Sequence, residues 1–275
     1  MPGVPEDLFF RCINIAVARN AEFVPPSESG ASLYIRPLLF GSSAQLGLSP
    51  PEEYTFVVYV LPVGVYHGTA AVDALVLETF DRAAPNGTGS AKVGGNYAPV
   101  LPHSEAAYKA GYGITLHLDS KSHRFIDEFS TSGFLGIRYD GDKTTLVVAD
   151  SENVIRSVTS DSVQTIARDL GWAVEKRQVT FEEVEGLHEV MAAGTAAALV
   201  PVKSIERKST ATKYVYDYGG QNPKGVTTLL EHLRGIQAGK LEDKHGWRVP
   251  VTEVGEDENA KDATNEADLD AVNAL

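Results

Sequence analysis

The sequence is poor in sulfur-containing residues and has no long apolar run. Among its 275 residues there are one cysteine, Cys12, and two methionines. A single cysteine cannot form an intrachain disulfide, so a disulfide-stabilised fold is excluded and a reducing compartment is expected. No uninterrupted apolar stretch is long enough to cross a bilayer, so no membrane association is predicted.

Basic residues are also scarce. Lysine and arginine number 24 against 37 aspartate and glutamate residues, which gives a formal net charge of −13. This balance excludes a basic surface for nucleic acid, so no nucleic-acid partner is predicted. Much of the excess lies in 252–275, where eight acidic residues accompany only Lys261. That segment lacks apolar periodicity and is predicted to be an acidic, disordered tail.

The first residues do not match a targeting signal. Pro2, Pro5 and two acidic residues precede the first apolar run, whereas a signal peptide needs a basic start and an apolar centre. Together with the lone cysteine, this start predicts a cytoplasmic protein. A mitochondrial form stays open, although no transit peptide is visible.

The remaining pattern is that of a globular protein with helices and strands. Apolar residues at helical spacing predict helices over 6–21, 97–111, 159–170 and 222–239. Runs rich in β-branched and aromatic residues predict strands over 32–40, 54–62, 74–80, 114–118, 124–128, 133–139, 144–148, 173–178 and 196–205. The four strands within 114–148 are expected to form a meander, with a hairpin turn at Asp140-Gly141-Asp142. This mixture predicts an α/β or α+β fold in which antiparallel segments are prominent.

The most informative segment is a glycine-rich loop with a lysine in it. Residues 87–97 are GTGSAKVGGNY, with four glycines around Lys92. The loop does not match a phosphate-binding P-loop, which needs Ser or Thr after the lysine, because Val93 follows Lys92. A dinucleotide-binding Gly-x-Gly-x-x-Gly is not in register either. From these residues alone, a surface loop with an exposed lysine stays open beside a ligand-binding loop.

The same segment resembles the cofactor loop of the fold-type IV enzymes, the family of the branched-chain aminotransferases, in which a lysine precedes Gly-Gly-Asn-Tyr. The resemblance implies that Lys92 binds pyridoxal 5′-phosphate (PLP) covalently and moves the α-proton of the substrate, since both tasks need an amine. It also implies that Tyr97 hydrogen-bonds the phenolic oxygen of the cofactor. No metal site is predicted.

A second matching segment is Ile126-Asp127-Glu128-Phe129, with Thr131 downstream. In an alternating strand, Asp127 and Glu128 point to opposite faces, so one can face a site while the other faces solvent. The resemblance assigns Glu128 to the pyridine nitrogen, which needs a carboxylate to stay protonated, and assigns Thr131 to the lining of the site. An exposed acidic turn is the alternative interpretation of these residues taken alone.

Two further positions match the phosphate contacts of the family. Val158 and Thr159 stand at the start of a predicted helix, and helix starts bind anions. In Gly194-Thr195-Ala196, the resemblance places Thr195 on the phosphate and the Ala196 backbone on the substrate carboxylate. Taken alone, Thr159 is more often a helix N-cap and Thr195 a loop residue.

Two segments near the N-terminus match substrate and dimer contacts. Tyr34 and Arg36 match residues near the substrate, and on a strand they share one face. Gln45-Leu46-Gly47-Leu48 resembles a loop that reaches across a dimer to line the partner's apolar pocket, so a homodimer is implied. Core packing of the two leucines is the alternative.

The resemblance extends over about 6–250. Residues 126–134, IDEFSTSGF, and 82–92, RAAPNGTGSAK, are similar to a fungal subgroup that includes HC-toxin-associated aminotransferase-like proteins. Better-known members have asparagine where Gly133 stands. The implied fold has a large PLP-binding domain over 51–251, built on a mixed or antiparallel pseudo-barrel, after a remnant of the small N-terminal domain over 1–50.

The family's small domain would need roughly 100 more residues on ordinary domain sizes. Those residues carry an arginine that pairs with the PLP phosphate, and no residue of this sequence matches it. A truncated chain, a divergent gene product or a deliberately reduced protein is therefore expected.

The implied activity is transfer of an amino group between a branched-chain or other apolar amino acid and 2-oxoglutarate. The fungal subgroup points to secondary metabolism such as peptide-toxin biosynthesis. Two alternatives remain. One is another fold-type IV chemistry, that of a lyase or a D-amino-acid aminotransferase. The other is a weakly active or non-catalytic homologue.

Overall fold

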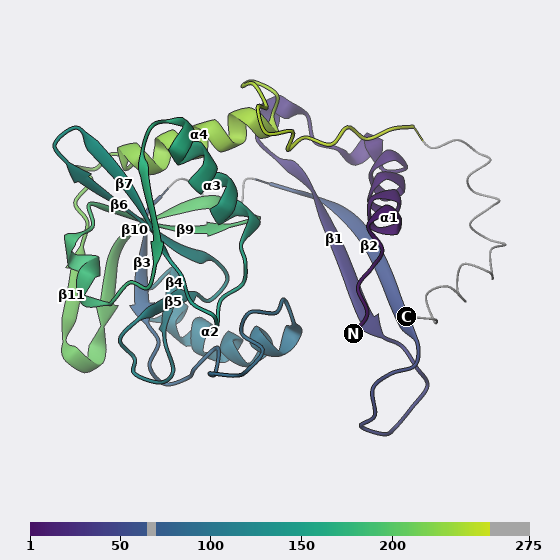
Figure 1. The fold of residues 1–275 in the computed structure, drawn as a ribbon, viewed down its shortest axis with the longest axis horizontal. Helices are drawn as coiled ribbons and strands as arrows, with labels where there is room; N and C mark the ends of the chain where they lie inside the picture. The colour runs from purple at the N-terminus through teal and green to yellow at the C-terminus, as the bar shows by residue number, and fades with distance from the viewer. Residues whose placement is uncertain (65–69, 254–275) are drawn as a thin grey trace. The chain divides into compact units, whose positions relative to one another are not determined.

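The computed structural model describes residues 1–64 and 70–253, and the chain divides into two compact units. One unit comprises Met1–Tyr66 and His245–Leu275, and the other comprises His67–Lys244. Figure 1 shows α1, β1 and β2 in the first unit and the large sheet with its helices in the second. From residue 254 onward, the predicted acidic tail lies outside the described residues.

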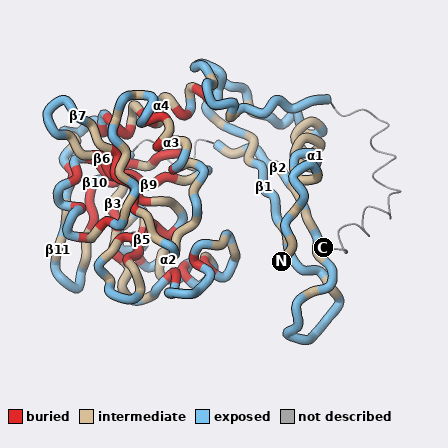
Figure 2. Tube along the Cα trace, viewed as in Figure 1, coloured by how far each residue is buried: buried red, intermediate tan, exposed pale blue. Residues whose placement is uncertain are grey.

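The first unit is built from a helix and a two-stranded hairpin. α1 spans Glu6–Ala18, β1 spans Ser32–Gly41 and β2 spans Tyr54–Val63, with 3-10 turns at Ala21–Phe23 and Ser27–Ser29. The strands are antiparallel along their whole length, from Ser32 opposite Val63 to Gly41 opposite Tyr54. The predicted domain boundary between residues 50 and 51 therefore falls inside this hairpin. No described residue of this unit is buried (Figure 2).

The second unit is organised around a nine-stranded mixed sheet. Its strands are β3 Val72–Val76, β4 Ile114–Leu118, β5 Ile126–Phe129, β6 Gly133–Asp140, β7 Lys143–Ala149, β8 Ala173–Arg177, β9 Glu189–Gly194, β10 Ala198–Arg207 and β11 Thr212–Val215. Their order is β5-β4-β3-β10-β9-β6-β7-β8, and β11 pairs with β10. β3 is parallel to β4 and β10, and β7 is parallel to β8, whereas the other pairs are antiparallel. The predicted mixed architecture is confirmed.

Helices pack on this sheet. They are α2 Leu101–Lys109, α3 Val158–Asp169 and α4 Lys224–Gln237, with 3-10 turns at Gly94–Asn96, Ala98–Val100, Glu182–Gly186 and Lys208–Thr210. α3 and α4 contact each other, and both contact β9 (Figure 1). α3 buries Val163, Ile166 and Ala167, which share one face of the helix. No helix of the described residues is long and apolar enough to span a membrane.

The core of this unit fixes β5, the strand that carries the predicted site carboxylate. Phe129 on β5 and Phe134 on β6 are fully buried and stack with their ring centroids 5.6 Å apart. Burial of one such side chain contributes about 1.5–3 kcal/mol. Glu128 therefore projects from a strand whose next residue is held in the core.

Two of the strand predictions need correction, and two strands are not predicted. The strands within 114–148 do not form a meander, because β4 pairs with β5 and β6 with β7, while the other edge of β6 pairs with β9. The strand expected over 74–80 ends at Val76. β9 and β11 are not predicted at all, because the almost wholly buried β9 shows no alternation. The hairpin turn at Gly141 is confirmed, with Asp140 opposite Lys143.

Candidate active site

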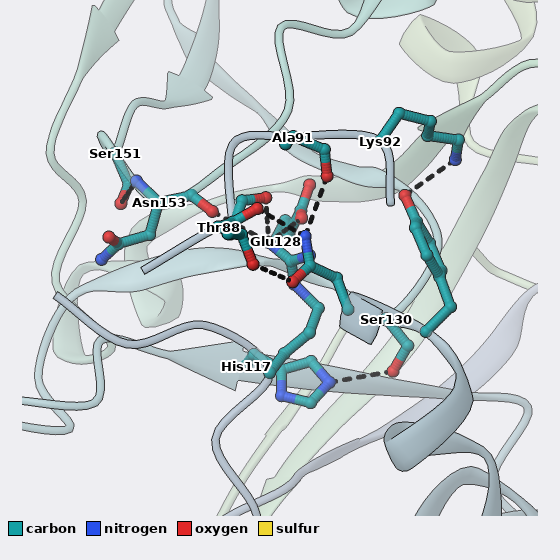
Figure 3. A network of polar contacts seen from close by, with 12 residues as sticks. Thr88, Ala91, Lys92, His117, Glu128, Ser130, Ser151 and Asn153 are labelled. Atoms are coloured by element: carbon teal, nitrogen blue, oxygen red, sulfur yellow. Dashed lines mark hydrogen bonds and ion pairs between the residues drawn. The ribbon is translucent and has the colours of Figure 1, made fainter. Parts of the chain in front are cut away.

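The loop that carries Lys92 is held closed by a buried asparagine. The Asn96 amide donates to the carbonyl oxygens of Thr88 at 2.6 Å and Ala91 at 2.8 Å, and its own oxygen accepts from the Thr88 hydroxyl at 3.0 Å (Figure 3). These three hydrogen bonds of one side-chain amide fix the loop backbone, which has no strand or helix hydrogen bonds at this point. The loop therefore presents Lys92 from a defined backbone.

Lys92 and Tyr97 face each other at the end of this loop. Lys92 Nζ lies 2.8 Å from the Tyr97 hydroxyl and 4.3 Å from the centroid of its ring. Lys92 is exposed, whereas Tyr97 is half-buried. The fold therefore brings together the two residues that the resemblance assigns to the cofactor, with the lysine amine accessible to a ligand.

Glu128 is buried and forms an ion pair with Arg82, whose guanidinium is also buried. Burial raises the pKa of Glu128 to about 7, and Arg82 opposes that rise. A carboxyl group whose pKa is near neutrality is a frequent feature of functional sites. The Glu128 side chain is drawn at the centre of the polar network in Figure 3.

The expectation that one of the two carboxylates on β5 faces solvent is wrong. Asp127 is 3% exposed and Glu128 is 6% exposed. The segment that leads into α3 covers both, because Ser151 interacts with Asp127 and the Ile155 backbone interacts with Glu128. Burial raises the pKa of Asp127 as well.

An open cavity of ≈ 1840 Å³ lies in front of these groups. Lys92, Asp127 and Glu128 line it. The segment before α3 and the first turn of that helix also contribute, through Ser151, Asn153, Ile155, Ser157, Val158 and Ser160. The cavity thus combines an amine, two buried carboxyls and the start of a helix.

The start of α3 is suited to an anion. Ser157 is the N-cap and accepts a hydrogen bond from the Ser160 N–H at 3.2 Å, so Thr159 belongs to the first turn and is not the cap. Unpaired N–H groups and the helix dipole favour negative charge at such a terminus. Val158 lines the cavity, whereas Thr159 does not.

The second predicted phosphate contact lies on a turn beside Thr131. Thr195 and Ala196 stand in the turn between β9 and β10, where Thr195 is exposed. A Cβ on Gly194 would lie 3.6 Å from the Thr131 carbonyl oxygen, so the two turns are neighbours. None of Thr131, Thr195 and Ala196 lines the cavity with Lys92.

Tyr34 and Arg36 belong to the first unit, on β1. Arg36 Nη2 donates to the Tyr34 hydroxyl at 3.0 Å, which agrees with the prediction that both side chains share a face. They therefore form a local pair within the hairpin.

A buried histidine fixes the chain just after β5. His117 Nε2 lies 3.0 Å from Ser130 Oγ (Figure 3), and Thr115 also contacts that hydroxyl. Burial lowers the pKa of His117 to about 4, and the positive charge of Arg82 adds to the effect. His117 is therefore neutral near neutral pH, and it holds Ser130 in place without carrying charge into the site.

Comparison with known proteins decides the family. The model of class IV amino-transferases matches residues 2–205. The chain belongs to the class IV aminotransferases. Among its relatives, aminotransferase atnJ of Emericella nidulans is 51% identical over 258 residues, covering 92% of this chain and 74% of atnJ. Branched-chain amino acid aminotransferase gloG of Glarea lozoyensis is 51% identical over 256 residues, covering 92% of this chain and 72% of gloG.

Solved aminotransferases share the fold. The branched-chain amino acid aminotransferase of Escherichia coli has a TM-score of 0.70 at 26% identity, covering 92% of this chain and 78% of that chain. The branched-chain aminotransferase of the thermophilic archaeon Thermoproteus uzoniensis, solved with norvaline, has a TM-score of 0.67 at 25% identity, covering 80% of this chain and 69% of that chain. The fold is therefore the mixed α/β fold of the branched-chain aminotransferases, as predicted.

Sequence reasoning misses three residues of this aminotransferase site. They are Arg82, which pairs with Glu128, Asn96, which closes the lysine loop, and Ser157, which caps α3. Asn96 stands inside the Gly-Gly-Asn-Tyr motif, and an amide within a glycine-rich loop is a usable signal for a turn. Nothing in the sequence pattern distinguishes a buried arginine from an exposed one.

Proposed function

We propose that this class IV aminotransferase uses PLP to move an amino group from a branched-chain or other apolar amino acid to 2-oxoglutarate. The observation that carries the proposal is the Lys92 amine, which is 2.8 Å from the Tyr97 hydroxyl and lines one cavity with the buried Glu128. Relatives named as aminotransferases of fungi, one of them a branched-chain enzyme, support the substrate class. We propose a place in fungal secondary metabolism from the resemblance of residues 82–92 and 126–134 to the fungal subgroup.

The residues of the cavity fit PLP at both ends of that molecule. Its pyridine ring needs a carboxylate, which Glu128 supplies, and its phosphate needs an anion site, which the start of α3 offers. A cavity of ≈ 1840 Å³ has room for both cofactor and substrate. When bound, PLP supplies an electron sink for the negative charge that develops at the substrate's α-carbon.

The chain's own groups then have separate tasks. Lys92 Nζ would hold the cofactor. Once freed from it, the amine would take the proton from the substrate α-carbon as a base and later give a proton back as an acid. The Tyr97 hydroxyl keeps that amine in position through the 2.8 Å contact. Glu128 keeps a negative charge opposite the ring nitrogen.

The proposed assembly is a homodimer. Leu46 and Leu48 are fully exposed in the loop between β1 and β2, which supports the expectation that this loop meets a partner. Isolated exposed leucines need no explanation, but two in one loop form an apolar tip.

The test is chemical. After PLP is added, borohydride reduction and peptide mapping should place the pyridoxyl mass on Lys92, and Lys92→Ala should remove it. Lys109→Ala changes an exposed lysine on α2 and is the matched control, which should keep the label on Lys92. Glutamate formation from L-leucine and 2-oxoglutarate measures the activity. A label on another lysine or on none would sink the proposal. Turnover of D-leucine but not L-leucine would show that the substrates are D-amino acids.

A further inference from the structure

Arg82 lies five residues before the glycine-rich loop 87–97 that carries Lys92, and it is one of the most deeply buried charged residues of the described chain. Its side chain is 1% exposed, and that of its partner Glu128 is 8% exposed. Burying a charged group is costly unless an opposite charge compensates it. Each of these two buried charges therefore needs the other for compensation, unlike the partners of an exposed ion pair.

The same guanidinium connects three segments of the site. Arg82 Nη2 donates to the Gly89 carbonyl oxygen at 3.3 Å and to the Asn153 carbonyl oxygen at 2.9 Å, as well as pairing with Glu128. Gly89 belongs to the lysine loop and Asn153 to the segment before α3. Any displacement of Arg82 would therefore move the elements that carry Lys92 and the helix start.

The charges around Glu128 do not favour ionisation without Arg82. Burial and the neighbouring Asp127 raise the pKa of Glu128, whereas Arg82, then Lys92 and the Ile155 backbone, lower it. Arg82 is the largest of the lowering influences, and still the pKa is about 7. Removing Arg82 would leave a neutral carboxylic acid at this position near neutral pH.

We propose that Arg82 is a positioning residue of the site, which keeps Glu128 ionised and binds one of its oxygens while the carboxylate faces the cavity. Its consequence for catalysis rests on the proposed function, because only a charged Glu128 can hold a pyridine nitrogen protonated. The ion pair itself does not depend on the identity of the cofactor.

The experiment measures Glu128 in the cofactor-free protein. The carbon-13 resonance of its carboxyl group is followed against pH and assigned by its loss in Glu128→Gln. In Arg82→Met, which keeps an unbranched side chain but removes the charge, we expect the titration midpoint to rise by roughly 1–3 pH units. Arg82→Lys, which keeps the charge, should stay closer to the wild-type midpoint than Arg82→Met does.

A second readout is cofactor binding. Arg82→Met should bind PLP more weakly at pH 7.5 than the wild type, and the difference should shrink at high pH as Glu128 ionises. The matched control is Arg168→Met on α3, which changes an exposed arginine. A midpoint that does not move in Arg82→Met overturns the proposal, as does PLP binding with an unchanged pH profile.

A folding defect of Arg82→Met can be told apart from the loss of its effect on Glu128. If Arg82→Met unfolds because it leaves a buried charge unpaired, Arg82→Met/Glu128→Gln should recover the fold, which supports the coupling. Failure of both variants to fold would show that Arg82 acts through Gly89 and Asn153 alone and would overturn the proposal. A shifted midpoint in a protein that takes up no PLP would sink the proposed function and leave the effect of Arg82 on Glu128 standing.

Discussion

Glu128 makes the unfolding free energy depend on pH. Its pKa is about 7 in the folded protein against an ordinary value of 4.5. Between these values the folded protein binds more protons than the unfolded chain, so the unfolding free energy falls as pH rises. The stabilising contribution is fully present below about 4.5 and is lost as pH passes about 7. Its size is on the order of 3 kcal/mol, at roughly 1.36 kcal/mol per pKa unit.

Glu128→Gln should therefore flatten the curve of unfolding free energy against pH between 4.5 and 7. Chemical denaturation at several pH values measures this. Glu105→Gln changes an exposed carboxylate on α2 and should keep the wild-type slope. Turnover of L-leucine should fall on the order of 100- to 1000-fold in Glu128→Gln, as for other lost electrostatic contacts in active sites. A wild-type slope in Glu128→Gln would show that another group titrates there.

At the scale of elements, the lysine loop is packed too closely for a side chain at Gly89. A Cβ at this position would overlap the Ala83 Cβ and the Asn153 carbonyl oxygen. The second of these is backbone of the segment before α3, which cannot move away without disturbing the helix start. Gly89 therefore fixes the distance between the two elements that face the cavity.

Gly89→Ala should cost about 1–3 kcal/mol, the usual range for overpacking, and should weaken PLP retention because the loop is displaced. Thermal unfolding and dialysis of the PLP-loaded protein measure the two effects. Gly186→Ala is the matched control, since a Cβ there meets nothing within 4 Å. Equal losses in both variants would mean that glycine flexibility, and not close packing, explains the result.

The sequence predicts strands well where runs of β-branched and aromatic residues are bounded by glycine, proline or serine. β1, β2 and β4 agree with their predicted ranges to within one residue at each end. β9 fails because its sequence, EVMAAG, has one β-branched residue and no alternation, so neither strand signal is present. The expectation that one carboxylate of β5 faces solvent fails because the segment that covers Asp127 is 24 residues away in the chain, at Ser151. Long-range packing of this kind leaves no local pattern.

At the scale of the whole molecule, the two units differ in how they are stabilised. Every buried side chain of the described residues lies between Ala74 and Ile236, within the larger unit. The smaller unit has a hairpin and a helix, yet its apolar side chains, among them Phe10, Leu38 and Tyr59, remain exposed. A small unit without buried residues lacks the hydrophobic term that offsets chain entropy.

This difference predicts opposite behaviour for two fragments. A fragment of residues 70–244 should unfold in one cooperative transition, because it keeps the complete sheet and its core. A fragment of residues 1–66 should show no cooperative transition, because a two-stranded hairpin is marginal in water and its helix buries no described residue against it. Circular dichroism during thermal unfolding measures both. A sharp transition in the 1–66 fragment, or its absence in the 70–244 fragment, would show that the larger unit does not hold the fold's stability by itself.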